Sequence, residues 1–470
     1  MRLKQAILAV TPRIALGWYH CVLAFIAALF YGFPSRSLTV IGVTGTKGKT
    51  STVFFIGKIL EDAGYYVGAV SGLYFKIGMH EEPNLRKMTM PGRFFMQHAL
   101  RAMVRAGCTH AILEVTSEGI AQHRHRFIDF DTAVFTNITP EHIESHGSFD
   151  MYLSVKQKLF AGLQNTCRTK RIKGKMVRMR KTIIGNGDDS HADDFMRFPA
   201  DKKYCFHVGS HDADEEISVC EHVVAEHVVA GHGGVRFAVG AVAFSSPLAG
   251  RFNVANMLAA LAVGISEGLQ MRAMREVIAR ISVLPGRMEY IKIGQPFDAV
   301  VDYAHTPESL DAVYRTLRMA LNEGDKKGKL ICVLGAAGGG RDRWKRPLFG
   351  AIAGMWGDEI FITNEDPYDE NPMAIMREIA EGSFRARELY VGHFGQEMLE
   401  DFAKKNHAMP RLTVDRRVAI RQALAMASPG DTVVVTGKGS EQRMAVLDGK
   451  LIPWDDRAVV REGLVGLVEQ

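Results

Sequence analysis

Short apolar runs alternate with amphipathic stretches along most of the chain from residue 38 onward. LTVIGVTG is predicted to be a strand, TSTVFFIGKILEDAG a helix that ends at Gly64, and YYVGAVSG the next strand. The series continues with a helix at RFFMQHALRAMVRAG and strands at THAILEVTS and DTAVFTNIT. Strands that alternate with helices predict an α/β fold with a doubly wound, mostly parallel sheet and helices on both faces.

A second series of apolar runs follows the segment LPGRMEY at residues 284–290. Its strand-like runs are DAVVDYAH, KLICVLGAAGGG, EIFITNEDP, RELYVGH and DTVVVTGKGS. We therefore expect a central α/β domain at 38–283 and a Rossmann-like C-terminal α/β domain at 284–470. An apolar helical segment at 1–37 precedes them.

The turn between the first predicted strand and helix, TGTKGKTS, has the composition of a phosphate-binding loop. Gly45 and Gly48 let backbone N–H groups at a helix N-terminus approach phosphate oxygens closely. Lys49 can reach the outer phosphates, and Thr50 offers a hydroxyl to Mg²⁺. The general GxxxxGK[ST] pattern would need glycine at Val43, so only the narrower form TGTxGK[ST] is matched.

Composition and charge narrow the class of protein and ligand. The 470-residue chain is 47% hydrophobic and 23% charged, which is typical of a globular protein. Its net charge of +6 fits an anionic ligand such as ATP or a nucleotide-sugar. Aromatic residues are not interleaved with basic ones, so we expect no nucleic-acid partner. The six cysteines form no CxxC pair, which predicts unpaired thiols in a reduced, cytoplasmic compartment.

Polar residues follow the later strands of the first series, where ATP and Mg²⁺ would need ligands. ILEVTSEG contains Glu114, and VFTNITPEHIESHG contains Asn137, Glu141 and His142. YLSVKQKLF contains Lys156, which by its spacing alone would be an ordinary surface lysine of a helix.

The order of these motifs resembles the Mur ligase family, whose members join an amino acid to a carboxylate through an acyl-phosphate at the expense of ATP. GRMEYI, DYAHTPESL, LGAAGGGRDRWKRPLFG and VVVTGKGSEQ are similar to the tripeptide synthetase type of that family. The resemblance covers residues 30–460. It implies a ligase that adds an amino acid to a muramyl-peptide carboxylate in peptidoglycan precursor synthesis, with UDP-N-acetylmuramoyl-L-Ala-D-Glu as the acceptor.

Carried over position by position, the resemblance implies roles for four sets of residues. Catalysis is assigned to Lys49, Glu114, His142 and Lys156, with Lys156 carbamylated by CO₂ and Mg²⁺ bound by Thr50, Glu114, His142 and Lys156. ATP binding is assigned to Gly45, Thr46, Gly48, Lys49, Thr50, Ser51, Asn137, Asn253, Asn256, Arg287, Asp302, Tyr303 and His305. Acceptor binding is assigned to Thr89, Thr116, Gln122 and Arg124, although Arg124 could equally be a surface arginine. The incoming amino acid is assigned to Arg341, Asp366, Tyr368, Gly437 and Glu441.

The sequence departs from the family pattern at four places. Only an apolar segment precedes the first strand, so we expect the domain that grips UDP in full-length members to be missing. The family's DNPR loop reads EDPY, and Tyr368 in place of arginine would leave a carboxylate of diaminopimelate unpaired, at a cost of roughly 2–4 kcal/mol. We therefore expect L-lysine rather than diaminopimelate, with Asp366 meeting its side-chain ammonium. Ser440 and Glu118 each replace a histidine of the family.

Residues 14–33 form an apolar stretch without lysine, arginine or acidic residues, long enough to cross a membrane. Basic residues before it would keep the N-terminus in the cytoplasm, and a single span would then export the ATP site. No small-residue cleavage site follows, which argues against a signal peptide. A helix packed on the protein, a helix lying in the membrane interface and a membrane span stay open as alternatives.

A second unusual stretch, RTKRIKGKMVRMRK at residues 168–181, holds eight basic residues and no acidic one. It is interpreted as a solvated loop or strand edge, with contact to an anionic ligand or lipid as the alternative.

Two other functions stay open beside the muramyl-peptide ligase. A Mur-like ligase that uses a lipid-linked or non-muramyl acidic acceptor would explain the missing domain, whereas Gln122 and Arg124 argue against it. A non-catalytic protein that binds ATP and a muramyl peptide would keep the fold, but intact Lys49, Glu114, His142 and Lys156 argue for turnover. We expect a cytoplasmic monomer, with peripheral contact to the inner face of the membrane through residues 14–33 as an alternative.

Overall fold

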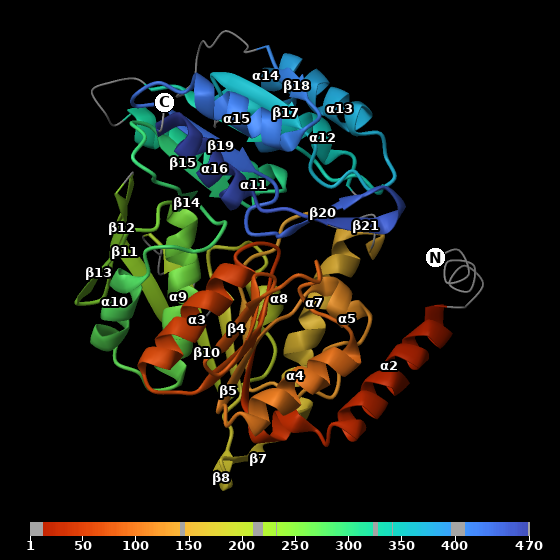
Figure 1. The fold of residues 1–470 in the computed structure, drawn as a ribbon. Helices are drawn as coiled ribbons and strands as arrows, with labels where there is room; N and C mark the ends of the chain where they lie inside the picture. The colour runs from red at the N-terminus through yellow and green to blue at the C-terminus, as the bar shows by residue number, and fades with distance from the viewer. Residues whose placement is uncertain are drawn as a thin grey trace. The chain divides into compact units, whose positions relative to one another are not determined.

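The computed structural model describes residues 13–141, 146–209, 220–231, 233–322, 328–340, 342–395 and 409–468. The described chain divides into two compact units (Figure 1). Unit 1 consists of the described residues within Met1–Val228, Arg236–Ser245 and Phe252–Arg280. Unit 2 consists of those within Val229–Val235, Ser246–Arg251 and Ile281–Gln470.

An eleven-stranded sheet forms the centre of unit 1, in the order β13-β12-β11-β10-β9-β6-β1-β5-β2-β3-β4. From β11 to β2 the neighbouring strands are parallel, and β3 and β4 join as an antiparallel edge. In register, Ile41 of the central strand lies opposite Ile112 on one side and Thr132 on the other. The strands are β1 (Thr39–Thr44), β2 (Val67–Val70), β3 (Tyr74–Ile77), β4 (His80–Pro83), β5 (His110–Glu114), β6 (Thr132–Phe135), β9 (Thr182–Asn186), β10 (Lys202–Val208), β11 (Glu221–Gly231), β12 (Gly234–Val239) and β13 (Val242–Ser246).

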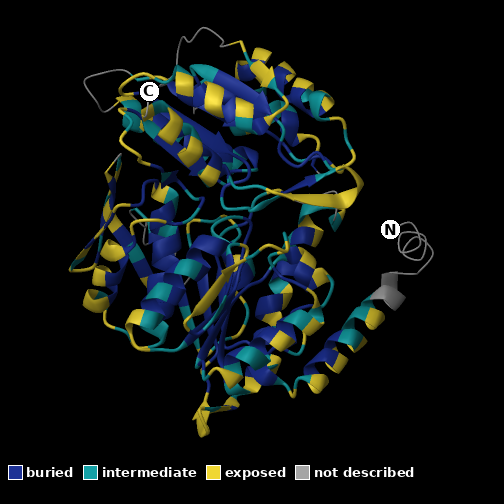
Figure 2. Cartoon of the chain, viewed as in Figure 1, coloured by how far each residue is buried: buried dark blue, intermediate teal, exposed yellow. Residues whose placement is uncertain are grey.

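Helices cover both faces of this sheet, so its central strands are buried on both sides (Figures 1 and 2). Leu100 and Phe160 pack from two helices into one cluster with Val40 and Leu113 of the sheet. The predicted mostly parallel sheet with flanking helices is therefore confirmed, and the first helix ends just before Gly64, whose φ is +85°. The helices are α2 (Arg13–Phe30), α3 (Lys49–Asp62), α4 (Arg93–Arg105), α5 (Ser117–Ala121), α7 (Phe149–Gly162), α8 (Ala192–Met196), α9 (Arg251–Ser266) and α10 (Met271–Arg280), with 3₁₀ turns η1 (Pro34–Ser37) and η2 (Leu163–Asn165).

The basic stretch at 168–181 forms an antiparallel hairpin of β7 (Thr169–Ile172) and β8 (Lys175–Arg178). Lys173 and Gly174 make the turn with positive φ, as a two-residue hairpin turn requires. Every residue of β8 is exposed, whereas Lys170 of β7 and Lys181 at the end of the stretch are buried.

The cysteine prediction is wrong for one pair, because Cys205 and Cys220 form a disulfide with their Cα atoms 6.0 Å apart. The reason is strand pairing, since Cys205 on β10 lies opposite His222 of the parallel β11, two residues after Cys220. Spacing in the sequence does not reveal such a neighbour. Cys21, Cys108, Cys167 and Cys332 are not part of a disulfide.

Unit 2 is built on a six-stranded sheet in the order β14-β15-β19-β16-β17-β18, parallel except for β14. Val301, Val333 and Val435 of its strands pack with Ile420 and Val460 of two helices. The strands are β14 (Glu289–Tyr290), β15 (Asp298–Asp302), β16 (Leu330–Leu334), β17 (Glu359–Thr363), β18 (Arg411–Thr413) and β19 (Thr432–Thr436), and β20 (Arg443–Val446) pairs with β21 (Lys450–Pro453). The helices are α11 (Pro307–Asn322), α12 (Lys345–Trp356), α13 (Pro372–Phe384), α14 (Ala386–Phe394), α15 (Arg416–Met426) and α16 (Asp456–Val468), with the 3₁₀ turn η5 (Leu447–Gly449).

One predicted strand of unit 2 is wrong, because RELYVGH lies in helix α14. Ala386 and Tyr390 are the buried residues of this helix, and their spacing of four is helical. The Tyr390 hydroxyl donates to the Asp311 carboxylate at 2.6 Å, and this long-range contact fixes the helix on its neighbours.

The apolar stretch at 14–33 contains helix α2, which packs on α4. Ala24, Ala27 and Ala28 are its buried residues among those described. Within the described part of the chain no helix is both long and apolar enough to cross a membrane.

Candidate active site

The phosphate-binding loop lies between β1 and α3, as predicted. Gly45 has φ +151° and Gly48 has φ +78°, which are backbone conformations that favour glycine. A Cβ at Gly45 would lie 2.0 Å from Thr136 Oγ1, and one at Gly48 would lie 2.2 Å from Asn256 Oδ1. Both glycines are therefore required by close packing as well as by backbone conformation.

Asn137 holds the loop in place through backbone and side chain. Its carbonyl accepts from Thr46 N at 2.8 Å, and its Oδ1 accepts from Lys47 N at 2.8 Å. Lys49 Nζ donates to the carbonyls of Gly45 at 3.0 Å and Thr46 at 2.8 Å. The Lys49 ammonium thus lies over a loop whose helix N-terminus attracts anions.

The other predicted ATP residues of unit 1 lie under this loop. Ser51 is buried in the first turn of α3, and Asn253 and Asn256 are buried on α9. Asn256 Oδ1 accepts from Thr52 Oγ1 at 3.5 Å. Sequence reasoning missed Thr136, whose Oγ1 donates to the Lys47 carbonyl at 2.6 Å.

A set of oxygen atoms suitable for Mg²⁺ lies beside the loop. Glu114, at the end of β5, accepts through Oε2 from Thr50 Oγ1 at 2.9 Å and from Gly72 N at 2.8 Å. A Cβ at Gly72 would lie 3.3–3.5 Å from Thr89 Oγ1, Thr50 Oγ1 and Glu114 Oε2, so three oxygens surround one point. Hydroxyl and carboxylate oxygens are ligands that Mg²⁺ prefers, so these residues fit the ion.

The predicted ligand His142 lies outside the described residues. Among the residues that are described, no group of three or more His, Cys, Asp or Glu side chains could hold a metal ion. The fit to Mg²⁺ therefore rests on Thr50 and Glu114 together with the nearby loop.

Lys156 is buried on α7, with 1% of its surface exposed, which excludes the surface interpretation. Its Nζ donates to the Gly45 carbonyl at 2.7 Å and lies 4.7 Å from the centre of the Tyr152 ring. Burial, and next the positive charge of Lys49, lower the pKa of Lys156 well below its usual value, although Glu141 opposes the shift. The neutral form of this amine is therefore more accessible than that of an exposed lysine.

The predicted acceptor residues gather at α5 and at the segment before α4. Thr116 caps α5 by accepting from Gly119 N at 3.1 Å, and Thr89 lies beside Gly72. Arg124 is buried; it donates to the Met90 carbonyl and, at 2.8 Å, to Gln122 Oε1. Burial lowers the pKa of Arg124, and Glu118 opposes this at 3.6 Å. The surface alternative for Arg124 is thus excluded.

In unit 2 the four residues predicted to bind ATP lie around the end of β15. Asp302 is buried and accepts from Met288 N and Ala304 N, each at 2.7 Å. Burial raises the pKa of Asp302, while Arg287 opposes the shift. The Arg287 guanidinium lies 4.3 Å from the centre of the Tyr303 ring, and His305 Nδ1 donates to the Tyr303 carbonyl at 2.8 Å. These residues form one connected group.

Glu441, one of the residues predicted to bind the amino acid, contacts the group at the end of β15. The Tyr303 hydroxyl donates to Glu441 Oε1 at 2.9 Å, which connects a predicted ATP residue to a predicted amino-acid residue. Gly437 follows β19 with φ +111°, and Tyr368, with φ +50°, has its ring against Gly339. Arg341 lies outside the described residues.

Asp366 has a partner inside the protein that the sequence did not indicate. Lys438 Nζ lies 3.0 Å and 3.1 Å from the two Asp366 carboxylate oxygens and 2.6 Å from Glu441 Oε2, and Ala445 N donates to Asp366 at 2.7 Å. Burial alone would lower the pKa of Lys438, but Glu441 and Asp366 raise it above its usual value. We therefore assign Asp366 to Lys438 rather than to an incoming ammonium.

Glu365 is a buried carboxyl group that sequence reasoning missed. Its Oε2 has no hydrogen-bond partner among the described residues, and a Cβ at Gly437 would lie 2.7 Å from that oxygen. Burial, and next the negative charge of Asp366, raise the pKa of Glu365 to about 7. The signal available in the sequence was its position directly before Asp366 in NEDPY.

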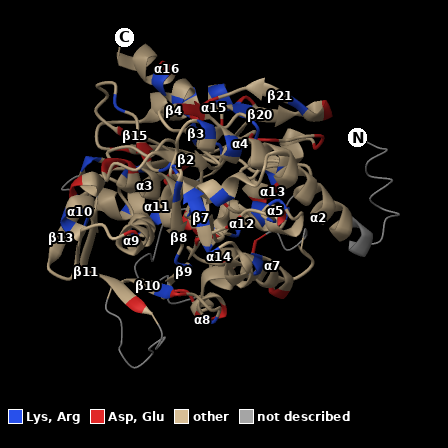
Figure 3. Ribbon diagram, turned by 90° about the horizontal axis from the view of Figure 1, so that it is seen from below, with Lys and Arg blue, Asp and Glu red and all other residues tan. Residues whose placement is uncertain are grey.

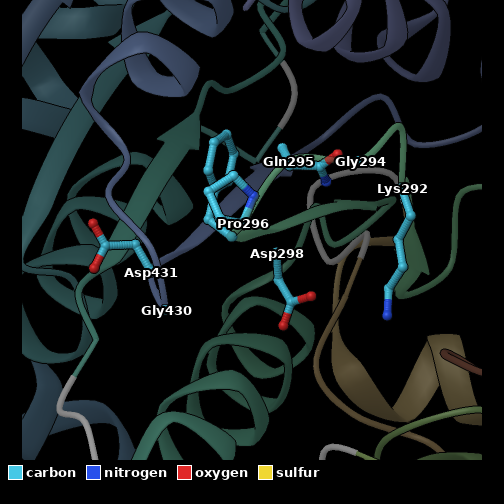
Figure 4. A pocket seen from close by; sticks show the side chains of 8 residues that line it. Lys292, Gly294, Gln295, Pro296, Asp298, Gly430 and Asp431 are labelled. Carbon is cyan, nitrogen blue, oxygen red and sulfur yellow. The ribbon is translucent and has the colours of Figure 1, made fainter. Parts of the chain in front are cut away.

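A pocket of about 390 Å³ lies elsewhere in unit 2 and is lined by Lys292, Gln295, Asp298 and Asp431, among others (Figure 4). Asp298 begins β15, and Asp431 precedes β19. Ligands of open parallel sheets bind at the carboxyl ends of the strands, where Asp302 and Gly437 lie, and this pocket is at the opposite ends. We assign it no part in the reaction.

Comparison with known proteins shows the family of this chain. Residues 43–264 match the Mur ligase middle domain, and residues 286–439 match the Mur ligase glutamate ligase domain. A UDP-N-acetylmuramyl-tripeptide synthetase of Roseiflexus sp. (strain RS-1) is 37% identical over 95% of this chain and 82% of its own length. A UDP-N-acetylmuramoyl-L-alanyl-D-glutamate--2,6-diaminopimelate ligase of Thermosynechococcus vestitus is 35% identical over 95% of this chain and 80% of its own.

Solved structures show the same fold. A UDP-N-acetylmuramoyl-L-alanyl-D-glutamate--2,6-diaminopimelate ligase matches with a TM-score of 0.56 and 26% identity, over 92% of this chain and 79% of that one. A folylpolyglutamate synthase of Mycobacterium tuberculosis matches with a TM-score of 0.61 and 17% identity, over 97% and 99% of the two chains, which shows the fold alone. By its matched domains and its relatives, this chain belongs to the Mur ligase family.

Proposed function

We propose that this protein is an ATP-dependent ligase that joins an amino acid to the carboxylate of a muramyl peptide in peptidoglycan precursor synthesis. The supporting observation is the convergence on Gly45: Lys49 and the buried Lys156 both donate to its carbonyl, and the Thr50–Glu114 pair lies beside the same loop. A buried amine whose pKa is strongly lowered, beside a phosphate loop, is typical of a functional site.

The reaction takes place in two steps. A carboxylate oxygen of the acceptor attacks the γ-phosphorus of ATP, which forms an acyl-phosphate and releases ADP. The amine of the incoming amino acid then attacks the acyl carbon, and the tetrahedral intermediate collapses to an amide, inorganic phosphate and a proton. The loop and Lys49 hold the phosphates and offset the charge that collects on them. Mg²⁺, held by Thr50 and Glu114, would supply further positive charge at the phosphates.

Lys156 is proposed to be carbamylated by CO₂. The neutral amine attacks the carbon of CO₂ and loses a proton, so an uncharged buried amine becomes a carboxylate-like anion. Its lowered pKa supports the first step, and the positive charges of Lys49 and Lys47 support the product. Such an anion beside the Thr50–Glu114 pair would add an oxygen ligand of the kind that Mg²⁺ prefers.

The substrates are proposed from the residues around each site. UDP-N-acetylmuramoyl-L-Ala-D-Glu is the expected acceptor, bound by Thr89, Thr116, Gln122 and Arg124. L-lysine is preferred over diaminopimelate because Tyr368 offers no charge to a second carboxylate. Since Asp366 is paired with Lys438, Glu365 is the carboxyl group proposed to meet an ammonium of the amino acid beside Gly437. The protein is proposed to act in the cytoplasm as a monomer.

Phosphate release by the purified protein tests this function. Mg²⁺-ATP and bicarbonate would be supplied with the acceptor and with L-lysine or diaminopimelate in turn, and products identified by mass. Release that requires both the acceptor and L-lysine supports the proposal. Release only with a different acidic acceptor would contradict the muramyl substrate, and no turnover with any acceptor would contradict the ligase itself.

A further inference from the structure

Helix α2 buries its small residues and exposes its large ones. Ala24, Ala27 and Ala28 face α4, and Arg101 of α4 donates to the Tyr31 carbonyl at 2.7 Å just after the helix. The large apolar side chains point away from the protein: Trp18, Tyr19, Val22, Ile26, Leu29 and Phe30 are exposed, at 71% for Trp18 and 74% for Phe30. Their spacing of three and four places them along one face.

This face is more apolar than the surface of a water-soluble monomer normally is. No lysine, arginine or acidic residue occurs between residues 14 and 33. Single exposed apolar residues are common, but a continuous row of large ones marks a contact surface. Aromatic residues with a polar tip, such as Trp18 and Tyr19, favour the boundary between water and lipid.

The β7–β8 hairpin provides positive charge in the same part of unit 1. Arg171, Lys173, Lys175, Arg178 and Arg180 are exposed, and no acidic residue occurs between 168 and 181. Met176, at 63% exposed, and Val177 add apolar surface between these cations. A cluster of this kind attracts anionic surfaces.

One buried carboxylate holds the hairpin rigidly on the sheet. Asp131 Oδ1 accepts from Lys181 Nζ at 2.9 Å, and its Oδ2 accepts from Lys170 Nζ at 2.5 Å. Lys170 and Lys181 are fully buried at the two ends of the basic stretch. The exposed cations between them therefore project from a fixed base.

The hairpin and the segment after α2 are joined directly. Asp129 accepts from Arg36 of η1 at 3.3 Å and from Cys167 N at 3.1 Å, and its own N donates to Ser35 Oγ at 3.0 Å. Strand β7 also packs on η1. Viewed from below the molecule, β7 and β8 lie near the centre of the view, and α2 lies at its right-hand edge (Figure 3).

We propose that the exposed face of α2 and the β7–β8 hairpin together dock the protein on an anionic lipid membrane. The helix lies in the interface with its apolar face toward the acyl chains, and the hairpin cations contact acidic headgroups. The charge of the hairpin favours this occupant over a second copy of the chain, since a second hairpin would bring the same sign of charge and no acidic partner.

Sedimentation of the full chain with lipid vesicles tests the docking. Vesicles of phosphatidylcholine with about one-third phosphatidylglycerol would be compared with pure phosphatidylcholine, at low and high salt. We expect binding to the anionic vesicles that weakens with salt. Lys173→Glu/Lys175→Glu should lower the partition coefficient at least about 20-fold, at roughly fivefold per cation removed. Trp18→Glu/Phe30→Glu should abolish sedimentation.

Matched controls come from exposed residues of other elements. Met319→Glu/Leu447→Glu is the control for the helix variant, because it places the same new charges on exposed apolar residues of unit 2. Arg272→Glu/Arg275→Glu on α10 is the control for the hairpin variant, because it makes the same change in net charge. Both should sediment like the parent, and all four variants should keep the phosphate-release rate with soluble substrates. The proposal would be overturned if the control variants lost as much vesicle binding as the test variants, or if the parent protein did not sediment with the vesicles. It would also be overturned if the parent were a dimer that dissociates in Trp18→Glu/Phe30→Glu.

Discussion

Two buried lysines, one in each unit, have pKa values shifted in opposite directions although both are buried. Lys156 lies among Lys47, Lys49 and a carbonyl, and its pKa is lowered by burial and by those cations. Lys438 lies among Asp366 and Glu441, and its pKa is raised although burial acts against it. Burial lowers the pKa of both amines, and the comparison shows that neighbouring charges decide the direction of the net shift.

The largest effect is expected from removing the reactive amine. Lys156→Ala should lower kcat by about 10³- to 10⁴-fold, roughly 4–5 kcal/mol, because the proposed carbamate ligand could no longer form. A small carboxylic acid such as formate should restore part of the rate in this variant by replacing the carbamate. Steady-state phosphate release measures both. Lys158→Ala, an exposed lysine on the same helix, should keep the parent rate, and an active Lys156→Ala without added acid would contradict the role.

Removing the charge of Lys438 should lower the stability of the fold. Lys438→Met leaves Asp366 and Glu441 without their partner, which should cost roughly 3–4 kcal/mol of unfolding free energy. Lys156→Met removes a buried amine that has no carboxylate partner at hydrogen-bonding distance among the described residues, and should change stability by about 1 kcal/mol or less. Urea unfolding of the two variants side by side decides this. Equal losses would show that the two lysines do not differ as proposed.

Glu365, a buried carboxyl group of unit 2, should make the stability of the protein depend on pH. Its pKa is raised from 4.5 to about 7 in the folded protein, so folding favours the protonated form. The contribution of Glu365 to the free energy of unfolding is fully present below pH 4.5, and it is lost as the pH rises through 7. Glu365→Gln should therefore gain stability over the parent by roughly 2.5 kcal/mol more at pH 8 than at pH 5.

Urea unfolding at the two pH values measures this gain. Glu381→Gln, an exposed glutamate on α13, is the matched control and should show no such difference. A gain that does not change with pH would mean that Glu365 is ionised in the fold throughout this range.

The smallest effect is expected from placing a positive charge at position 368 of unit 2. Tyr368→Arg should raise kcat/KM for diaminopimelate relative to L-lysine by roughly tenfold, because a second carboxylate would gain a charge partner. Tyr368→Phe, which keeps the ring without charge, should leave the ratio near that of the parent. Competition between the two amino acids, read by product mass, gives the ratio directly. An unchanged ratio in Tyr368→Arg would place the distal carboxylate elsewhere.

Local features of the site could be predicted from the sequence. The phosphate loop follows a strand of β-branched residues and precedes a helix, so Gly45, Lys49 and Thr50 are positioned by neighbours within one turn. Glu114 was found in the same way, because it ends a strand beside the first one.

Long-range pairings could not be predicted. Lys438 and Asp366 are 72 residues apart, and the pairing of Asp366 depends on how β17 and β19 flank β16. The disulfide of Cys205 and the helix at RELYVGH likewise depend on partners on other elements. Burial of Lys156 was suggested only by the resemblance to the family, because an isolated helical lysine is normally exposed.

The central claim is that the acceptor carboxylate becomes an acyl-phosphate, and transfer of labelled oxygen tests it most directly. Acceptor labelled with ¹⁸O in the reacting carboxyl group would be turned over with Mg²⁺-ATP and the amino acid. One carboxylate oxygen bridges to phosphorus and leaves with it, so the account predicts inorganic phosphate that carries one ¹⁸O for each amide formed. Unlabelled phosphate with amide formation would contradict it.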